Sequence, residues 1–427
     1  MATSEFARLP GFRDFPPEDF ALRSHIQEAW RRVARRYGFS EYDGPPLESL
    51  DLYTEKSGDE IVGQLYNFVD KGDRPVALRP EMTPSLARIL ADRSRGMGKP
   101  IRWFSMPQLF RYERQQRGRL REHFQWNVDI VGEAGVGADA EVLAVAIDGL
   151  RELGLTADDF AARVSDRRLL TAVLAVVGVD DDRMPVAFGI IDKIERMPEE
   201  KADELFRDEV GLDAAAIARL RAILASTSLD QLAELLGDER GPDEEMARLR
   251  EYVGIFDAMG LGDFVELDLR IVRGLAYYTG IVFELFDRKG ELRAICGGGR
   301  YDRLLELVGG EPLPAVGFGM GDVVLGELLA ERDLVPEYAP HVDYFLVPVT
   351  EEQRSELLRI AHVLRERGHS VAYELRERSL GKQMKAATRE GAETVLLFGP
   401  EEVERGCVVV HDMKTGAESD MLLSELA

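Results

Sequence analysis

The sequence contains very little cysteine and no long apolar run. Among its 427 residues only Cys296 and Cys407 are cysteines, and they form neither a C-x-x-C pair nor a group with histidine at metal-ligand spacing. A disulfide framework and a structural zinc site are therefore excluded as the basis of the fold, and we expect a reducing, cytoplasmic location. The longest apolar stretches, such as "TAVLAVVGV", are far shorter than the roughly 20 residues that a membrane-spanning helix needs, so we expect no membrane partner.

Basic residues are also in the minority. The chain has 54 Lys and Arg against 78 Asp and Glu, for a formal net charge of -24. A field of this sign repels polyanions at long range, although screening lets a local basic patch act at short range. One such patch is "FRYERQQRGRLREHFQ" (Phe110–Gln125), which carries five arginines. This segment, rather than the total charge, needs a functional explanation.

The common nucleotide-binding loops are missing as well. "GFGMGD" does not complete a G-x-G-x-x-G, because Asp322 stands at its last position, and Gly381-Lys382 lacks the upstream glycine of a P-loop. These absences disfavour a dinucleotide-dependent or P-loop enzyme. Glycine has no side chain, so the glycines of "CGGGRYD" and "GFGMGD" still indicate places where another group approaches the backbone closely.

The length and the hydrophobic pattern predict an α/β protein of two domains. Residues 1–330 read as a mainly antiparallel sheet with helices, an α+β arrangement, interrupted at about 167–260 by an acidic helical insertion. "PVALRPE", "IRWFSMPQLFRYE" and "HFQWNVDIVG" are predicted to be neighbouring strands of one sheet, and a later hairpin is predicted to turn at "DRKG". Residues 331–340 have the proline and charge content of a linker, and 341–427 alternate β, α, β, α, β as a small second domain.

If "LFRYE" and "FQWNVDIV" pair, the segment between them is a loop at one end of the sheet. Side chains alternate along a strand, so each strand then has a polar row, namely Arg111 with Glu113, and Gln125 with Asn127 and Asp129. Guanidinium groups match phosphate geometry with two parallel hydrogen bonds. The other interpretation is a solvated hairpin tip held by structural ion pairs, and the loop alone does not decide between them.

Five segments in order resemble the class II histidyl-tRNA synthetases: "LRPEMTPSLAR", "FRYERQQRGR", "IVRGLAYYTGIVFE", "CGGGRYDRL" and "PAVGFGMG". The resemblance covers nearly the whole chain. It includes a first motif around "GPPLE", which forms the dimer in that family, and a terminal segment similar to an anticodon-binding domain. It implies a class II antiparallel sheet with a helical insertion, and ATP-dependent ligation of histidine to its tRNA through a histidyl-adenylate.

The resemblance also implies roles for individual residues. Arg111 and Arg273 match the arginines at the α-phosphate of ATP, and Glu113 matches the adenine contact, with Mg²⁺ held mainly through ATP rather than by the protein. The α-amino and carboxylate groups of L-histidine would meet Glu81, Thr83 and Gln125. Its imidazole would meet Asp129 and Tyr278, with Tyr277 and Tyr301 beside them, although core packing is the better interpretation for at least one of the adjacent tyrosines. Contacts to the histidine tRNA are implied for Arg114, Gln116, Arg117 and Arg119 in the first domain and for Arg376, Arg378, Lys382 and Lys385 in the second.

Three departures from the family pattern affect these expectations. Val324 stands where the third motif usually has an arginine, Ala276 replaces an acidic residue, and "LREHFQ" replaces the usual "YRQFHQ". We expect a homodimeric variant synthetase in which Arg300 or Mg²⁺ compensates for the missing guanidinium. The alternatives are the histidine-sensing regulatory subunit of ATP phosphoribosyltransferase, which lacks an anticodon-binding domain, and an inert synthetase-like RNA-binding protein, which would lack the ATP contacts.

Overall fold

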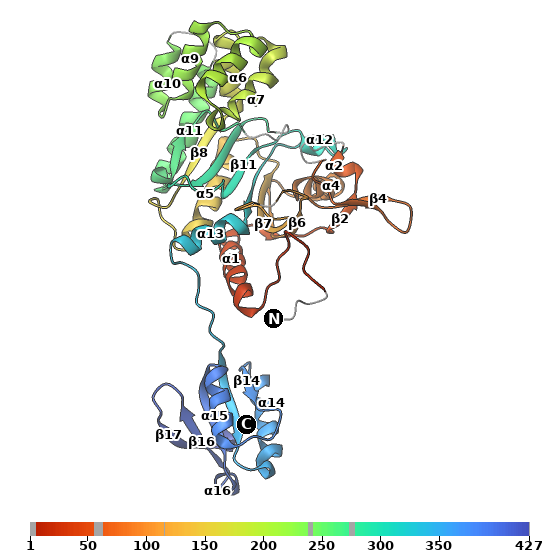
Figure 1. Ribbon diagram of the computed structural model, residues 1–427, viewed down its shortest axis with the longest axis vertical. Coiled ribbons are helices and arrows are strands. Elements are labelled where there is room, and N and C mark those ends of the chain that lie inside the picture. Colours follow the sequence, from red (N-terminus) through yellow and green to blue (C-terminus); the bar gives the residue numbers. More distant parts are fainter. Residues whose placement is uncertain (1–5, 55–62, 115, 238–241, 273–277, 427) are drawn as a thin grey trace. The chain divides into compact units, whose positions relative to one another are not determined.

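The structure is a computed structural model that describes residues 6–54, 63–114, 116–237, 242–272 and 278–426 (Figure 1). The chain forms two compact units, Met1–Pro336 and Glu337–Ala427. The division between them falls within the segment that the sequence predicts to be a linker. In the described residues, no helix combines the length and the apolar character needed to cross a membrane.

A nine-stranded, mostly antiparallel sheet forms the centre of the first unit, which confirms the predicted fold class. The pairings β1 with β5 and β8 with β9 are parallel, and the other pairings are antiparallel. The strands follow the order β1 (Ser40–Glu41), β5 (Ile101–Ser105), β7 (Glu122–Val131), β12 (Ala315–Gly321), β11 (Cys296–Arg300), β10 (Ile281–Asp287), β8 (Phe160–Asp166) and β9 (Val265–Leu267), with β6 (Gln108–Phe110) paired to one end of β7.

One face of this sheet is covered by helices and contains the main apolar core. The covering helices are α1 (Pro17–Arg36), α5 (Val136–Arg151) and α13 (Asp322–Glu331). Alternate residues of β7 point into this layer, and Trp126 stacks on Trp30 with 5.7 Å between ring centroids. Gly149 of α5 has no room for a side chain, because a Cβ there would lie 2.4 Å from the Trp126 ring. The intervening residues of β7 therefore face the opposite side of the sheet.

The strand β4 (Pro75–Leu78) lies outside this sheet, so the prediction that "PVALRPE" is a neighbour of β5 and β7 is wrong. It is the middle strand of a three-stranded sheet with β2 (Leu47–Ser49) and β3 (Asn67–Val69). Pro45 and Pro46 separate β1, which pairs with β5 in the large sheet, from β2, which pairs with β4 in the small one. The short helices α2 (Asp51–Thr54) and α4 (Thr83–Arg93) follow β2 and β4.

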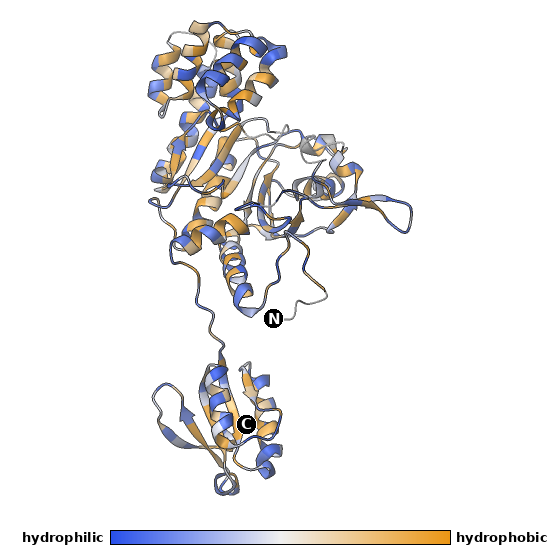
Figure 2. Cartoon of the chain, in the orientation of Figure 1, coloured by the Kyte–Doolittle hydropathy of each residue, from blue (hydrophilic) through white to orange (hydrophobic). Residues whose placement is uncertain are grey.

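The predicted helical insertion packs at one end of the first unit, where Figure 1 shows α6, α7, α9 and α10 together beyond β8. Its helices carry hydrophilic and hydrophobic residues side by side (Figure 2), as expected for amphipathic helices with one buried stripe. The elements are α6 (Arg167–Val176), η2 (Asp181–Arg183), α7 (Met184–Ile191), η3 (Ile194–Arg196), α8 (Glu199–Leu205), η4 (Phe206–Val210), α9 (Ala214–Leu224), α10 (Leu229–Leu236) and α11 (Asp243–Met259).

The hairpin between β10 and β11 is longer than the predicted "DRKG" turn. That turn exists, because the Gly290 amide donates to the Asp287 carbonyl at 3.1 Å. The chain after this turn, however, pairs with β10 only from Ile295 onward, where the Ile295 amide donates to the Leu285 carbonyl. Residues 288–295 therefore form an extended connection, and α12 (Leu304–Leu307) follows β11.

The second unit is a five-stranded sheet in the order β14 (Val371–Tyr373), β13 (Val342–Pro348), β15 (Ala392–Phe398), β16 (Cys407–Asp412) and β17 (Glu418–Leu422). Its first three strands are parallel, as the β, α, β, α, β pattern predicts, whereas β16 and β17 form an antiparallel hairpin that the sequence reading did not include. The helices are α14 (Arg354–Glu366), α15 (Leu380–Arg389), α16 (Pro400–Glu404) and α17 (Leu423–Leu426).

Candidate active site

The floor of the candidate site is the polar row of β7 on the face opposite α5. Asp129 pairs in register with Gly317 of β12, and Gln125 pairs with Gly321. A Cβ on Gly317 would lie 2.1 Å from Asp129 Oδ1, and one on Gly319 would lie 2.7 Å from Gln125 Cδ. The glycines of "GFGMG" are therefore needed because polar side chains of the neighbouring strand lie across their backbone.

A buried carboxyl and phenol form the centre of this floor. The Tyr301 hydroxyl donates to Asp129 Oδ1, and both side chains are buried. Burial raises the pKa of Asp129 to about 7, and the hydrogen bond from Tyr301 partly opposes that rise. A carboxyl in this state can accept a hydrogen bond or a proton from a ring nitrogen near neutral pH.

Tyr278 forms a wall beside this pair. It is buried in the same apolar cluster as Tyr301, and a Cβ on Gly299 would lie 3.0 Å from its Cδ1. Gly299 pairs with Gly317, so Tyr278 stands two strands away from Asp129. The other predicted members of this region, Tyr277 and Arg273, lie outside the described residues.

Arg111 and Glu113 form a second group at the loop end of β6. The Arg111 Nε donates to the Pro80 carbonyl at 3.0 Å, and its Nη1 lies 4.0 Å from Glu113 Oε1. Pro80 precedes Glu81, which is buried, and Thr83, which is the first residue of α4. The hydrogen bond to Pro80 thus links the predicted ATP contacts to the predicted α-amino and carboxylate contacts.

Two aromatic residues of the site were missed by the sequence analysis. His123 belongs to the same alternating row as Gln125 and Asp129, and burial together with Arg111 lowers its pKa to about 3, so its ring is neutral. Tyr42 packs on Trp103 at 5.2 Å between centroids, and burial and the Asp129 charge raise its pKa. The period of two along β7 could have identified His123, whereas only the pairing of β1 with β5 brings Tyr42 here.

The arginine-rich loop contains both exposed cations and structural ion pairs. Arg114 and Gln116 are exposed. Arg117 pairs with Glu327 at 3.2 Å and with Glu331, both on α13, and Arg119 pairs with Glu113 at 2.9 Å. A tight turn at Gly118, which has a φ of 72°, separates these two arginines. The ion-pair interpretation thus describes part of the loop, and the predicted RNA contacts of its residues stay predictions.

Arg300 cannot compensate for the missing arginine, so the part of the expectation that named Arg300 is wrong. Its guanidinium is buried and bonds to Asp139 at 2.7 Å and to the Glu133 carbonyl at 2.9 Å. It also pairs in register with Val316, near the start of β12, whereas Val324 follows the other end of that strand. Arg300 therefore neutralises a buried carboxylate and lies too far along the sheet to replace a guanidinium at Val324.

In the second unit, the predicted basic residues gather around α15. Lys382 and Lys385 are exposed on one side of this helix, while Gln383, Ala386 and Ala387 are buried on the other. Arg376 and Arg378 are exposed in the segment before it, and Arg378 Nε lies 3.4 Å from Glu374. These four residues form the predicted basic strip, and its partner is a prediction from the resemblance.

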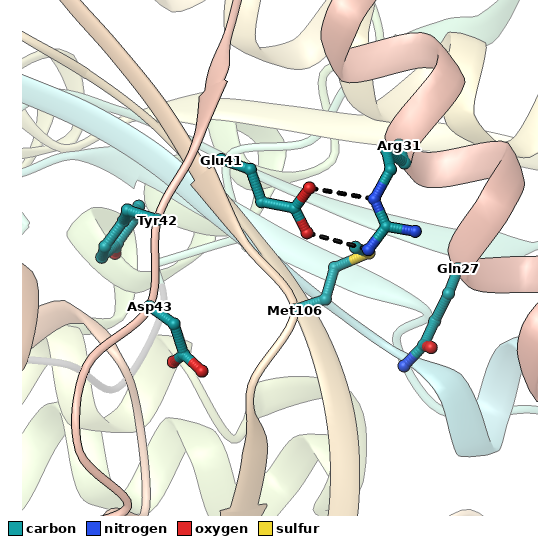
Figure 3. A pocket seen from close by; sticks show the side chains of 6 residues that line it. All are labelled: Gln27, Arg31, Glu41, Tyr42, Asp43 and Met106. Atoms are coloured by element: carbon teal, nitrogen blue, oxygen red, sulfur yellow. Dashed lines mark hydrogen bonds and ion pairs between the residues drawn. The ribbon is translucent and has the colours of Figure 1, made fainter.

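Two cavities lie away from the predicted site residues. One of about 270 Å³ lies between α1 and β1, where Arg31 forms a two-pronged contact with Glu41 beside Gln27 and Asp43 (Figure 3). The other, of about 790 Å³, lies between the insertion and β9, and Arg163, Arg270 and Asp268 contribute to its lining.

Comparison with known proteins places this site in a family. Residues 11–321 match the family model described as histidyl-tRNA synthetase, and residues 343–427 match the model described as anticodon binding domain. The chain is 44% identical over 425 residues to the histidine–tRNA ligase of Opitutus terrae, covering 99% of this chain and 96% of that protein. It is 42% identical over 418 residues to the chloroplastic/mitochondrial histidine–tRNA ligase of Arabidopsis thaliana, covering 97% of this chain and 85% of that protein.

The fold also matches a solved structure. Histidyl-tRNA synthetase from Nostoc sp. PCC 7120 has a TM-score of 0.82 with this chain, covering 99% of this chain and 98% of that one at 23% identity. At this identity the match shows a shared fold. Because a family model covers most of the chain and relatives at 44% and 42% identity align over nearly its full length, the chain belongs to the histidyl-tRNA synthetase family.

Proposed function

We propose that this chain ligates histidine to its tRNA in two steps, through a histidyl-adenylate made from histidine and ATP. The observation that carries the proposal is the buried contact between Asp129 and Tyr301 on the floor of the sheet. A carboxyl whose pKa lies near 7, with a phenol beside it, suits an imidazole, which has two ring nitrogens and titrates in the same range.

The floor gives a physical basis for choosing histidine. Asp129 and Tyr301 would face one ring nitrogen of the bound histidine, and Tyr278 would face the ring from the side of β10. The α-amino and carboxylate groups of the amino acid would be held by Gln125, Glu81 and Thr83. An amino acid without a ring N–H would offer the buried carboxyl no partner beyond Tyr301, and losses of this kind give roughly 10⁴-fold discrimination.

ATP is proposed to bind at the end of β7 where the loop begins. Arg111 and Arg273 would hold the α-phosphate, on which negative charge builds as the histidine carboxylate attacks, and Glu113 would accept from the adenine. Fixed cations lower such a barrier most where the charge develops. Mg²⁺, held through the phosphates of ATP, would neutralise part of their charge.

The histidine tRNA is proposed to contact both units. Its acceptor end would meet the loop that carries Arg114, Gln116, Arg117 and Arg119, and its anticodon stem would meet the strip of Arg376, Arg378, Lys382 and Lys385. Local cations of this kind can bind phosphates although the whole chain is acidic, because screening limits the repulsive field to short range.

A homodimer is part of the proposal. The strand β1 lies at one edge of the large sheet and both its residues are exposed, so one side of it is available for a second copy. The family's dimer-forming first motif corresponds to this region. A cytoplasmic location, expected from the cysteine content, completes the proposal. The regulatory-subunit alternative is disfavoured because it lacks the second unit.

The direct test is charging of the histidine tRNA with labelled histidine, together with histidine-dependent exchange of pyrophosphate into ATP. We expect activity with histidine and none with the other amino acids. Arg111→Ala should slow exchange by about 10²- to 10³-fold, as loss of a preorganised cation typically does. Arg207→Ala is the matched control, because Arg207 is an exposed arginine of the insertion. Exchange no faster than background with every amino acid would refute the proposal.

A further inference from the structure

Arg293 lies beside the position where the family's third-motif arginine is missing. It belongs to the extended connection 288–295 between β10 and β11. A Cβ on Gly118 would lie 3.7 Å from Arg293 Cδ and 3.2 Å from Val324 Cγ2. The stem of Arg293 and the side chain of Val324 therefore both pack against the same side of Gly118 in the arginine-rich loop.

The surroundings of Arg293 are mostly cationic. Burial and the charge of Arg119 lower its pKa, Arg196 of η3 acts in the same direction, and Glu113 opposes them. The charges of Arg119 in the loop and Arg196 in the insertion thus both act on Arg293 in the β10–β11 connection. Among the described residues, Glu113 is the one carboxylate whose charge acts on Arg293, and it already pairs with Arg119 at 2.9 Å.

Arg293 also differs from its neighbours in its contacts. Arg117 and Arg119 each reach a carboxylate within 3.2 Å. In the described part of the chain, Arg293 has neither an ion pair nor a side-chain hydrogen bond. Cations held close together without enough counter-charge repel each other, and a bound anion removes that repulsion. A guanidinium is suited to a phosphate, which it can contact with two parallel hydrogen bonds.

We propose that Arg293 binds the outer phosphates of ATP and replaces the guanidinium that Val324 cannot provide. This inference rests on the proposed function, because it places the nucleotide at Arg111 and Glu113. Glu113 contacts Arg111 through Oε1 at 4.0 Å and Arg119 through Oε2 at 2.9 Å, and its charge also acts on Arg293. The inner and outer phosphates would therefore meet different cations.

The test compares ligands with and without outer phosphates. The variants are Arg293→Ala and the conservative Arg293→Lys, and the matched control is Lys289→Ala, which removes one positive charge from the same connection at an exposed position. Binding of ATP and of AMP is measured by calorimetry, and the KM values for ATP and tRNA are measured by pyrophosphate exchange and charging. Thermal unfolding shows whether each variant is folded.

We expect Arg293→Ala to weaken ATP binding and to raise the KM for ATP by about tenfold to a hundredfold, the usual effect of losing a hydrogen bond to a charged group. AMP binding and the KM for tRNA should stay unchanged, and Arg293→Lys should recover part of the ATP affinity. Lys289→Ala should behave as the unaltered protein does.

Two other outcomes would overturn the inference, and a third would separate it from the proposed function. Equal losses for ATP and AMP would show that Arg293 does not read the outer phosphates. A raised KM for tRNA with unchanged ATP binding would assign the cluster to RNA instead. If the unaltered protein fails to charge tRNA but Arg293→Ala still lowers the ratio of ATP to AMP affinity, the nucleotide site stands and only the proposed reaction is refuted.

Discussion

The charge of Asp129 should control both the stability of the first unit and the binding of histidine. Its pKa is about 7 in the folded chain, against an ordinary value of 3.8. The folded state therefore holds a proton on Asp129 that the unfolded chain releases, so unfolding becomes easier as pH rises from about 4 to about 7. Asp129→Asn keeps the shape and the Tyr301 contact but cannot ionise.

The magnitude follows from the size of the shift. A rise of about three pKa units, at about 1.4 kcal/mol for each, corresponds to a difference of about 4 kcal/mol between the two ends of that pH range. Other titrating groups are the same in both proteins and cancel in the comparison. The free energy of unfolding of Asp129→Asn, minus that of the unaltered protein, should therefore rise by about 4 kcal/mol between pH 4 and pH 8.

Urea denaturation followed by tryptophan fluorescence measures this difference. The chain has three tryptophans, Trp30, Trp103 and Trp126, and all of them lie in the first unit, so the signal reports on that unit alone. Tyr301→Phe provides a second arm. The Tyr301 hydroxyl stabilises the carboxylate, so its removal should raise the pKa of Asp129 further. The loss of stability should still begin near pH 4 and should extend to higher pH.

The same ionisation should appear in activity. If the carboxylate form accepts the imidazole N–H, then kcat/KM for histidine should fall as pH drops below about 7, and Asp129→Asn should be weak at every pH. If the stability difference between the two proteins stays constant from pH 4 to pH 8, the pKa of Asp129 is not raised in the folded chain. The argument that this carboxyl binds the imidazole would then be refuted.

Three further predictions concern other parts of the structure. Gly317→Ala should abolish histidine activation and cost about 1–3 kcal/mol of stability, because its Cβ would overlap Asp129; normal exchange by a folded variant would contradict this. Arg300→Ala should destabilise the first unit by about 3–5 kcal/mol by leaving Asp139 unpaired, and adding Asp139→Asn should restore most of the loss in urea denaturation. Lys382→Ala combined with Lys385→Ala should weaken tRNA binding and flatten its salt dependence while pyrophosphate exchange stays normal; an unchanged salt slope would exclude α15 from the RNA contact.

Local sequence patterns predicted much of the frame of this protein. Alternation along β7 placed Gln125 and Asp129 on one face, and the proline and charge content of residues 331–340 marked the segment in which the two units divide. The same alternation includes His123, so that residue could have been found. The wrong expectation for β4 came from treating nearness in sequence as pairing, whereas β4 pairs with β2 and β3 instead.

The sequence by itself determined which chemical groups are present and their order along the chain: the arginine-rich loop, the glycine-rich strands, and a valine in place of an arginine. Only the tertiary structure decided which of those groups are already paired. Arg300 and Arg117 meet carboxylates from α5 and α13, whereas Arg293 lies beside Val324 and other cations. These contacts join residues far apart in the chain, and no local pattern encodes them, because they depend on how strands and helices pack together.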